Sequence, residues 1–264
     1  MTKTVAVLGP QLTYTDAAAK KYYRKQRIRR VYPSSIDAVI AAVESGEADE
    51  GVVPEENRVK HEIEETYARI YGGNVTTVGK VIIPIQNCVG TYGSVPLDGI
   101  TEVWTKADAY AQCGDWLGRH MPNARLVARN STAGAIEELS REKLTYVAAI
   151  GPHLAIAHYG LHSAAQGIDD RKDNATLFAV IRKGRVAWIP EAEEHIPSGD
   201  CETWLMMMPS GDAAGELYRL LTPISRHGVD MTKIVSITQD RLMRDGKELL
   251  HLPGGYLFQV NVRG

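Results

Sequence analysis

The sequence predicts an α/β protein in which short apolar strands alternate with helices along most of the chain. Residues 4–8 and 146–150 are apolar runs of the length and composition found in strands buried on both faces of a parallel sheet. A turn with helix-capping spacing, Thr13-Tyr14-Thr15-Asp16, follows the first of these strands. From residue 200 onward the pattern changes to strand, helix, strand, strand, which indicates a separate small α+β unit.

Length and composition narrow the class of protein. The chain has 264 residues, 44% of them hydrophobic and 23% charged, as expected for one large or two to three small globular domains. The net charge of −2 argues against a general nucleic-acid binder. Cys88, Cys113 and Cys201 are too widely spaced for a metal-ligand pair and are typical of reduced cytoplasmic thiols.

Membrane and export signals are not expected either. No apolar run approaches the ~20 residues that cross a bilayer, and residues 1–10 indicate a strand and not a signal peptide. We therefore expect a cytoplasmic protein that uses no metal or organic cofactor and binds neither nucleic acid nor membrane.

The first part of the chain predicts one sheet and its covering helices. Strands are expected at residues 4–8, 28–32, 51–54 and 75–78, and helices at 17–25, 36–44 and 63–70. Apolar residues give the second helix a core face, and Gly46 is the expected stop signal at its end.

A second lobe is predicted between about residues 82 and 155. The apolar run 81–89 is expected to cross into it, strands at 101–104, 124–128 and 146–150 follow, and helices are expected at 105–119, 133–141 and 151–159. The chain then returns through residues 168–170 to a last strand that has to rejoin the first sheet. The predicted divisions are a two-lobed domain over 1–182 with parallel-rich sheets, a linker over 183–199 and the small unit over 200–264.

Short polar turns are candidates for a binding site between the lobes. Thr13, Thr105 and Ser131 each stand where a predicted helix begins, and the unpaired backbone N–H groups of a helix start attract anions. Thr176 follows Asn174 at the mouth of the returning strand. Two lobes whose helix starts face a cleft suit a small ligand with carboxylates. The same residues are also typical of plain helix caps and strand boundaries, so both interpretations stay open.

The order and spacing of the motifs resemble those of the prephenate dehydratase family over essentially the whole chain. The family patterns Gly-Pro-x-Gly-Thr-Phe-Thr, Val-Pro-Ile-Glu-Asn-Ser, Ser-His-Pro-Gln-Ala-Leu-Ala-Gln-Cys and Ser-Thr-Ala have counterparts at residues 9–15, 53–58, 105–113 and 131–133. Closing motifs match Tyr159-Gly160-Leu161 and Asn174-x-Thr176-x-Phe178. The resemblance implies a fold similar to type 2 periplasmic binding proteins and a dicarboxylate substrate, prephenate.

Five positions in the proposed cleft depart from the family pattern. Leu177 stands where the family's Thr-Arg-Phe has arginine, and the others are Leu12 for glycine, Glu55 for isoleucine, Arg58 for serine and Lys106 for histidine. A dehydratase expels both carbon dioxide and hydroxide from prephenate, whereas a decarboxylase has to keep acid catalysis away from the ring hydroxyl. Leucine cannot donate a proton to that oxygen.

The resemblance with these departures favours a prephenate decarboxylase of secondary (antibiotic) metabolism. The alternatives are a divergent prephenate dehydratase of phenylalanine biosynthesis and a non-catalytic small-molecule sensor.

The resemblance also implies roles for single residues. Thr176 is expected to hydrogen-bond the substrate, Leu177 to control loss of its hydroxyl, and Asn57 to orient the ring substituent. The residues expected to bind or border the substrate are Thr13, Thr15, Thr105, Lys106, Ser131, Thr132, Phe178 and Arg58. For Arg58 and Lys106, an exposed surface role is the alternative.

The C-terminal unit resembles an ACT domain, most clearly at residues 228–234. Residues 235–238, Val-Ser-Ile-Thr, stand where the family's ACT domains bind phenylalanine near Glu-Ser-Arg-Pro, so feedback by phenylalanine is not expected. The unit is expected to be shortened, without the final helix and strand. An exposed sheet edge in such a unit favours pairing with another subunit, which predicts a homodimer or homotetramer.

Overall fold

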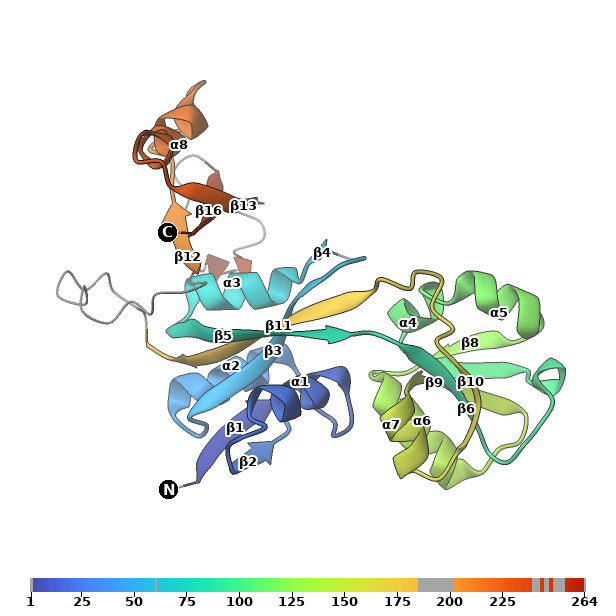
Figure 1. The fold of residues 1–264 in the computed structure, drawn as a ribbon. Helices are drawn as coiled ribbons and strands as arrows, with labels where there is room; N and C mark the ends of the chain where they lie inside the picture. The colour runs from blue at the N-terminus through green and yellow to red at the C-terminus, as the bar shows by residue number, and fades with distance from the viewer. Residues whose placement is uncertain are drawn as a thin grey trace. The chain divides into compact units, whose positions relative to one another are not determined.

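The computed structural model describes residues 2–59, 61–184, 202–238, 243–244, 247–248 and 255–263. The chain divides into two units, Met1–Arg185 and Val186–Gly264. The predicted linker lies outside the described residues from 185 onward, as does Cys201. The predicted α/β class is confirmed, because the first unit holds two sheets with helices packed on their faces (Figure 1). We call residues 2–84 and 175–184 the first lobe, and residues 87–166 the second lobe.

The first lobe is built on a sheet in the order β2-β1-β3-β11-β5, with β4 (His61–Glu62) beside β3. Its parallel strands are β1 (Lys3–Val7), β2 (Ile28–Val31) and β3 (Glu50–Asn57). The returning strand β11 (Ala175–Lys183) runs antiparallel between β3 and β5 (Val75–Pro84), so it rejoins the first sheet as predicted. Helix α1 (Tyr14–Tyr22) packs on one face, and α2 (Ile36–Ser45) packs on the other together with residues before and in α3 (Glu64–Gly72).

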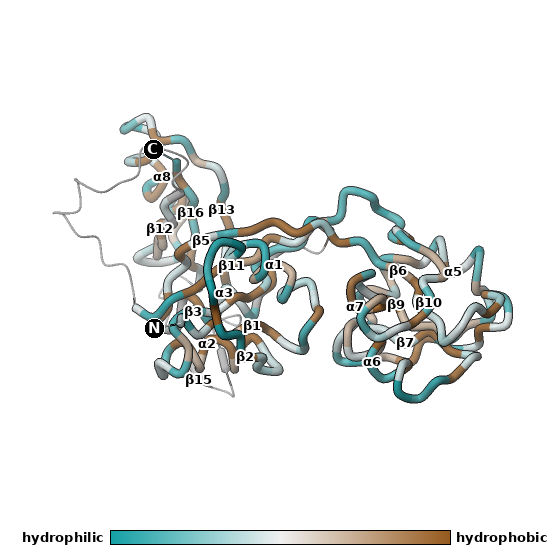
Figure 2. The backbone as a smooth tube through the Cα atoms, turned by 60° about the horizontal axis from the view of Figure 1, so that its bottom comes forward, coloured by the Kyte–Doolittle hydropathy of each residue, from teal (hydrophilic) through white to brown (hydrophobic). Residues whose placement is uncertain are grey.

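The second lobe has a sheet in the order β10-β6-β9-β7-β8. Its strands are β6 (Asn87–Thr91), β7 (Glu102–Thr105), β8 (Arg125–Ala128), β9 (Val147–Pro152) and β10 (His162–Gln166). Helices α6 (Thr132–Glu142) and α7 (His153–His158) cover one face, while α4 (Ala107–Ala111) and α5 (Gly114–His120) lie over the other, with a 3-10 turn at Leu97–Gly99. Figure 2 shows how hydrophobic segments gather in the strands of each lobe.

Both sheets are mixed, so the prediction of parallel-rich sheets holds only for β1 with its two neighbours and for β7 with its two neighbours. The chain enters the second lobe through β5 and β6 and leaves it through β10 and β11, and these four strands pair antiparallel. The sequence does not predict β6 and β10. The apolar run 81–89 contains the end of one strand and the start of another, and the segment His162–Gln166 is too polar to reveal a strand.

Hydrogen bonds join the two crossings between the lobes, residues 85–86 and 167–174. The amide of Ile85 donates to Asn174 O at 3.0 Å, and the amide of Ile168 donates to Asn87 O at 3.0 Å. The buried carboxylate of Asp169 accepts from the backbone N–H of Asn87 at 2.7 Å and from its Nδ2 at 2.6 Å. The crossings are therefore held together as one connection.

Helix α1 begins at Tyr14, three residues earlier than predicted. Its start is capped by the side chains of Thr13 and Asp16, which both accept hydrogen bonds from backbone N–H groups. Thr13 Oγ1 accepts from the amide of Asp16 at 3.3 Å. The buried Asp16 carboxylate accepts from the amide of Leu12 at 3.1 Å and from the Tyr32 hydroxyl at 2.9 Å, and it pairs with Lys20 Nζ at 2.8 Å. Burial alone raises the pKa of Asp16, but these hydrogen bonds outweigh it and hold the pKa below its ordinary value.

The predicted cap at Thr105 is wrong. Thr105 is the last residue of β7, is fully buried, and its hydroxyl donates to Ile150 O on β9 at 2.8 Å. The N-cap of α4 is Lys106, which makes no side-chain capping bond. The single helix predicted over 105–119 is divided into α4 and α5 at Gln112 and Cys113.

The second unit has the predicted order of one strand, one helix and two strands. These are β12 (Glu202–Met207), α8 (Glu216–Arg226), β13 (Asp230–Thr238) and β16 (Tyr256–Arg263), with the short pair β14 (Met243–Arg244) and β15 (Lys247–Glu248). The three long strands form an antiparallel sheet in the order β12-β16-β13. The ACT resemblance and the homodimer or homotetramer stay predictions.

Replacing Gly51 with alanine should destabilise the first lobe. A Cβ at Gly51 lies 3.0 Å from side-chain carbons of Val39, Val43 and Ile181, so these packed side chains have to shift by a few tenths of an ångström. We expect Gly51→Ala to lower the free energy of unfolding by about 1–3 kcal/mol in urea denaturation. Gly118→Ala is the control, because open space surrounds that helical glycine, and it should raise stability by about 0.5–1 kcal/mol. Equal stability of the two variants would contradict the packing of α2.

Asp16 predicts a pH dependence of stability. A carboxyl whose pKa is lower in the folded than in the unfolded chain stabilises the fold above its unfolded pKa of about 3.9 and loses that contribution as pH falls through the folded pKa. Unfolding titrations between about pH 6 and pH 2 should therefore show a shallower loss of stability for Asp16→Asn than for the wild type. Tyr32→Phe keeps the carboxylate and removes one hydrogen bond, so its slope should be intermediate. Superimposable curves for all three proteins would refute this role of Asp16.

Candidate active site between the two lobes

A cavity of about 330 Å³ lies within the first unit and is lined from both lobes. This volume is at the lower end of the range of ~300–1,000 Å³ found for small-molecule sites. The lining residues are Leu12, Thr13, Tyr14, Ala17, Ile83 and Pro84 from the first lobe, Gln86 from the crossing, and Cys88, Pro152, His153, Leu154 and Gln166 from the second. The start of α1 therefore borders the cavity, as the sequence predicts for an anion-binding helix start.

Tyr14 ties α1 to the crossing beneath this cavity. Its hydroxyl donates to Gln86 O at 2.8 Å and lies 3.4 Å from Asn87 Oδ1. Burial raises the pKa of Tyr14, and the nearby Asp169 carboxylate raises it further, so the phenol is a neutral donor at physiological pH. On the opposite wall, His153 Nδ1 lies 3.4 Å from Gln166 Nε2. The cavity thus has polar groups at several points of a largely apolar lining.

A buried network of amides and a hydroxyl includes Thr176, the strand partner of the cavity-lining Ile83, but Asn57, Asn174 and Thr176 are not among the described residues that line the cavity. Asn57 Nδ2 donates to Asn174 Oδ1 at 2.9 Å and to Thr176 Oγ1 at 2.9 Å. Asn57 Oδ1 accepts from the amide of Val59 at 3.0 Å, which fixes the orientation of the Asn57 amide. Thr176 is paired with Asn57 on β3 and with Ile83 on β5. Because Ile83 lines the cavity and directly opposed residues share a face of a sheet, Thr176 and Asn57 lie on the cavity face.

The network extends into the second lobe. Asn174 Nδ2 donates to Gln112 Oε1 at 3.2 Å, at the end of α4. Thr176 accepts from Asn57, and among the described residues its own hydrogen has no protein acceptor. The Thr176 hydroxyl can therefore donate a hydrogen bond while it accepts one from Asn57.

Leu177 lies on the opposite face of the sheet from Thr176. Residues 175–180 of β11 pair with β5 without a register shift, so their side chains alternate strictly between the two faces. Phe178 belongs to the apolar cluster under α1, whereas Leu177 is opposed to Ile82, which is 54% exposed. Leu177 does not line the cavity. The proposed contact between Leu177 and the ring hydroxyl is therefore not part of the geometry.

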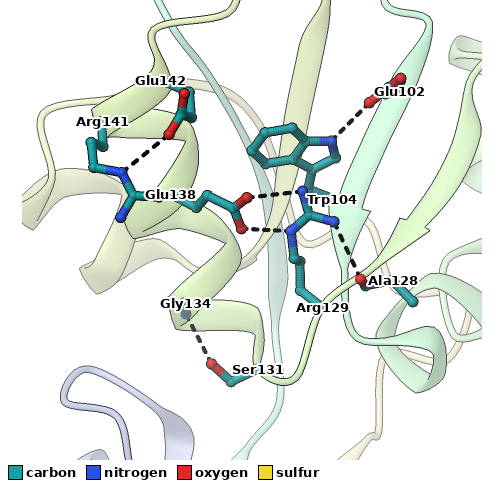
Figure 3. Close-up of polar contacts among 9 residues, drawn as sticks. All are labelled: Glu102, Trp104, Ala128, Arg129, Ser131, Gly134, Glu138, Arg141 and Glu142. Carbon is teal, nitrogen blue, oxygen red and sulfur yellow. Dashed lines mark hydrogen bonds and ion pairs between the residues drawn. The ribbon is translucent and has the colours of Figure 1, made fainter.

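Other residues predicted to bind substrate have structural partners of their own. Ser131 caps α6 by accepting from the amide of Gly134 at 2.9 Å (Figure 3). Thr15 is buried in the first turn of α1, Phe178 packs in the first-lobe core, and Thr105 is bonded to Ile150 O. Thr132 is the first residue of α6 and packs beside Gly151.

The arginine and lysine side chains near these turns either contact neighbouring residues of the protein or are exposed to solvent. Arg129, just before Ser131, stacks on Trp104 with its Cζ 4.1 Å from the ring centroid and forms two bonds to Glu138 at 2.5 and 3.0 Å (Figure 3). Lys106 lies 3.8 Å from Asp108 with its side chain 58% exposed. Arg58 is exposed, and its amide donates to Ala175 O at 2.9 Å. Among the residues that the structure describes, no lysine or arginine lines the cavity.

Some residues of the site are not identifiable from the sequence. Tyr14 lies between Thr13 and Thr15, which the sequence analysis predicts to bind substrate. Its aromatic side chain within that motif is the sequence feature that could have identified it. Gln86 lies in a crossing, Gln166 ends β10 and His153 begins α7, and no periodicity marks these positions as parts of a cavity wall.

Two further features concern the described part of the chain. No helix found there is long and apolar enough to span a bilayer. No cluster of three or more histidine, cysteine, aspartate or glutamate side chains is arranged there to hold a metal ion.

Comparison with known proteins places these motifs in a family. The prephenate dehydratase family model matches residues 5–185, more than half of the chain. A bifunctional chorismate mutase/prephenate dehydratase of Neisseria gonorrhoeae is 32% identical over 261 residues, 99% of this chain and 66% of that protein. One from Stutzerimonas stutzeri is 32% identical over 243 residues, 92% of this chain and 62% of that protein. The chain thus spans just under two thirds of the length of these curated relatives.

Solved structures agree with the fold. The prephenate dehydratase of Arthrobacter aurescens in complex with L-Phe superposes with a TM-score of 0.80 at 27% identity, over 99% of this chain and 80% of that one. The two mixed-sheet lobes are those of the prephenate dehydratase fold. From the family match and the relatives together, the chain belongs to the prephenate dehydratase family.

Proposed function

We propose that the chain is a carbon–oxygen lyase that converts prephenate to phenylpyruvate, carbon dioxide and water. The observation that carries the proposal is the Thr176 hydroxyl, which is held by Asn57 at 2.9 Å on the cavity face of the first sheet. The relatives named prephenate dehydratase support the same assignment. Prephenate decarboxylase, the interpretation favoured by the sequence departures, is supported less well.

The dehydration requires stabilisation of one substrate oxygen, that of the departing ring hydroxyl. When the bond between the ring and its carboxylate breaks, the electron pair moves through the ring and expels the ring hydroxyl, which takes up a proton and leaves as water. The products are carbon dioxide, water and aromatic phenylpyruvate, so one proton is consumed. A donor placed against the departing oxygen stabilises the charge that develops there, and one such donor is worth ~10²–10³ in rate.

Thr176 has the required arrangement for this donor. Because its oxygen accepts from Asn57 Nδ2, its hydrogen is directed away from Asn57. Asn57 is fixed in turn by Asn174 and by the amide of Val59, so the threonine is oriented before substrate arrives. Preorganised donors of this kind need no rearrangement during the reaction.

The substrate carboxylates have a neutral but polar receptor. Thr13 begins the nine-residue helix α1 at the cavity wall, and backbone N–H groups at a helix start favour negative charge. Because no lysine or arginine is among the described lining residues, we assign carboxylate binding to this helix start and to the side-chain amide of Gln86.

The second candidate, prephenate decarboxylase, rests chiefly on Leu177 among the five departures from the family pattern. Leucine there removes the guanidinium that the family pattern has beside Thr176. Since the residue faces away from the cavity, its influence on the hydroxyl has to pass through the sheet. This indirect route is the reason for preferring the dehydratase.

Incubation with prephenate separates the candidates. We expect equal amounts of carbon dioxide and phenylpyruvate, measured by gas release and chromatography. Release of carbon dioxide with a non-aromatic product that keeps its hydroxyl would establish the decarboxylase instead. Saturable prephenate binding in calorimetry without turnover would support the sensor.

Asn57 and Thr176 are expected to act as one unit. Thr176→Val removes the donor and should lower kcat by ~10²–10³, and Asn57→Ala should lower kcat comparably because the hydroxyl loses its orientation. The double variant should be little worse than either single one, since residues that act together are not additive. Thr101→Val, at an exposed threonine, is the matched control. Multiplicative losses in the double variant would show that the two residues act separately.

A further inference from the structure

Leu12 adopts a backbone conformation that leucine rarely takes. Its φ is 65°, in the left-handed region that favours glycine, and among the described residues Lys143 is the other non-glycine residue with positive φ. Lys143 stands at the C-cap of α6, where a left-handed residue is common. Leu12 instead precedes the N-cap of α1, so its conformation needs another cause.

The side chain of Leu12 provides that cause. Leu12 is 9% exposed and belongs to the apolar cluster of the second lobe, which includes Trp104, Ile136 and Ile156. Its amide donates to Asp16 Oδ2 at 3.1 Å, which fixes the turn on the first-lobe side. Every other residue of that cluster comes from the second lobe, so Leu12 bridges the two lobes.

Leu12 is at the same time a wall of the inter-lobe cavity, beside Thr13 and opposite Leu154 and Gln166 of the second lobe. The cavity of about 330 Å³ is near the lower limit for a ligand site. A four-carbon side chain at this point takes up space that a glycine with the same backbone leaves open.

We propose that Leu12 is the specificity-determining residue of this cavity. Its side chain joins the lobes and takes up cavity space, so that for an aromatic or cyclohexadienyl oxo acid a single six-membered ring is favoured over fused rings. The identity of the substrate rests on the proposed function, whereas the preference for the smaller ring rests on the place of Leu12 in the cavity lining.

Two probes of different ring size test the limit. Phenylpyruvate carries one ring and 3-(2-naphthyl)pyruvate carries two, and the dissociation constants of both are measured by calorimetry on the full chain. The wild type should bind phenylpyruvate more tightly. In Leu12→Gly, which keeps the backbone conformation without strain, the preference should shift toward the naphthyl acid by ~10-fold or more, as hydrophobic pockets discriminate on this scale.

Further variants distinguish the effect of side-chain volume at position 12 from the effect of backbone strain. Leu12→Ala keeps the unfavourable φ and should shift the preference in the same direction, and it carries the test if Leu12→Gly does not fold in circular dichroism. Leu12→Phe should weaken binding of both acids. Lys143→Gly relieves the same kind of backbone conformation far from the cavity lining and should leave the preference unchanged.

The outcomes distinguish this proposal from the proposed function. An unchanged preference in both Leu12→Gly and Leu12→Ala overturns the role of Leu12, as does a wild type that binds neither acid. A shifted preference in a protein that produces no phenylpyruvate from prephenate keeps Leu12 as the size limit and removes the dehydratase assignment.

Discussion

The arrangement of the first unit depends on the buried carboxylate of Asp169. It accepts two hydrogen bonds from Asn87, one from the backbone N–H and one from the side chain, and so binds the outgoing crossing to the returning one. A buried charge that lost these donors would carry a large desolvation cost. The two crossings are thereby held side by side, and the returning chain enters the first sheet at Ala175 with Asn174 and Thr176 in place.

The candidate site follows from that constraint. Asn57 comes from a strand near the start of the chain, and Asn174 and Thr176 come from the crossing that ends the second lobe. The cavity beside them is completed by α1 and by strand ends of the second lobe. The Thr176 hydroxyl at the junction of two lobes is placed by long-range pairing, and each lobe contributes part of its surroundings.

The sequence predicts much of this fold and less of the site. Thr13 and Ser131 cap their helices as capping residues do, and Gly46 ends α2 in the left-handed conformation. The alternation of side chains in a strand already separates Leu177 from Thr176, whereas the predicted roles brought both residues to the substrate. The alternation rule does not predict which face of the sheet carries Asn57. A bulge in β3 leaves Glu55 unpaired with β11. Strict alternation from the core residue Val52 therefore places Asn57 on the wrong face. Thr105 shows the same limit, because only the neighbouring strand reveals the acceptor of its hydroxyl.

The central position of β11 has a consequence for folding of the protein during its synthesis. The strand that lies between β3 and β5 is the last of the first lobe to be synthesised, and it joins residues as far apart as Asn57 and Thr176. Until it emerges from the ribosome, the sheet of the first lobe lacks the strand that connects its halves, while the second lobe, an uninterrupted segment, has all of its strands. Late pairing between distant residues slows folding and leaves strand edges exposed. The second lobe is therefore expected to fold first during translation. The sheet of the first lobe is expected to be completed afterwards, when β11 pairs with β3 and β5.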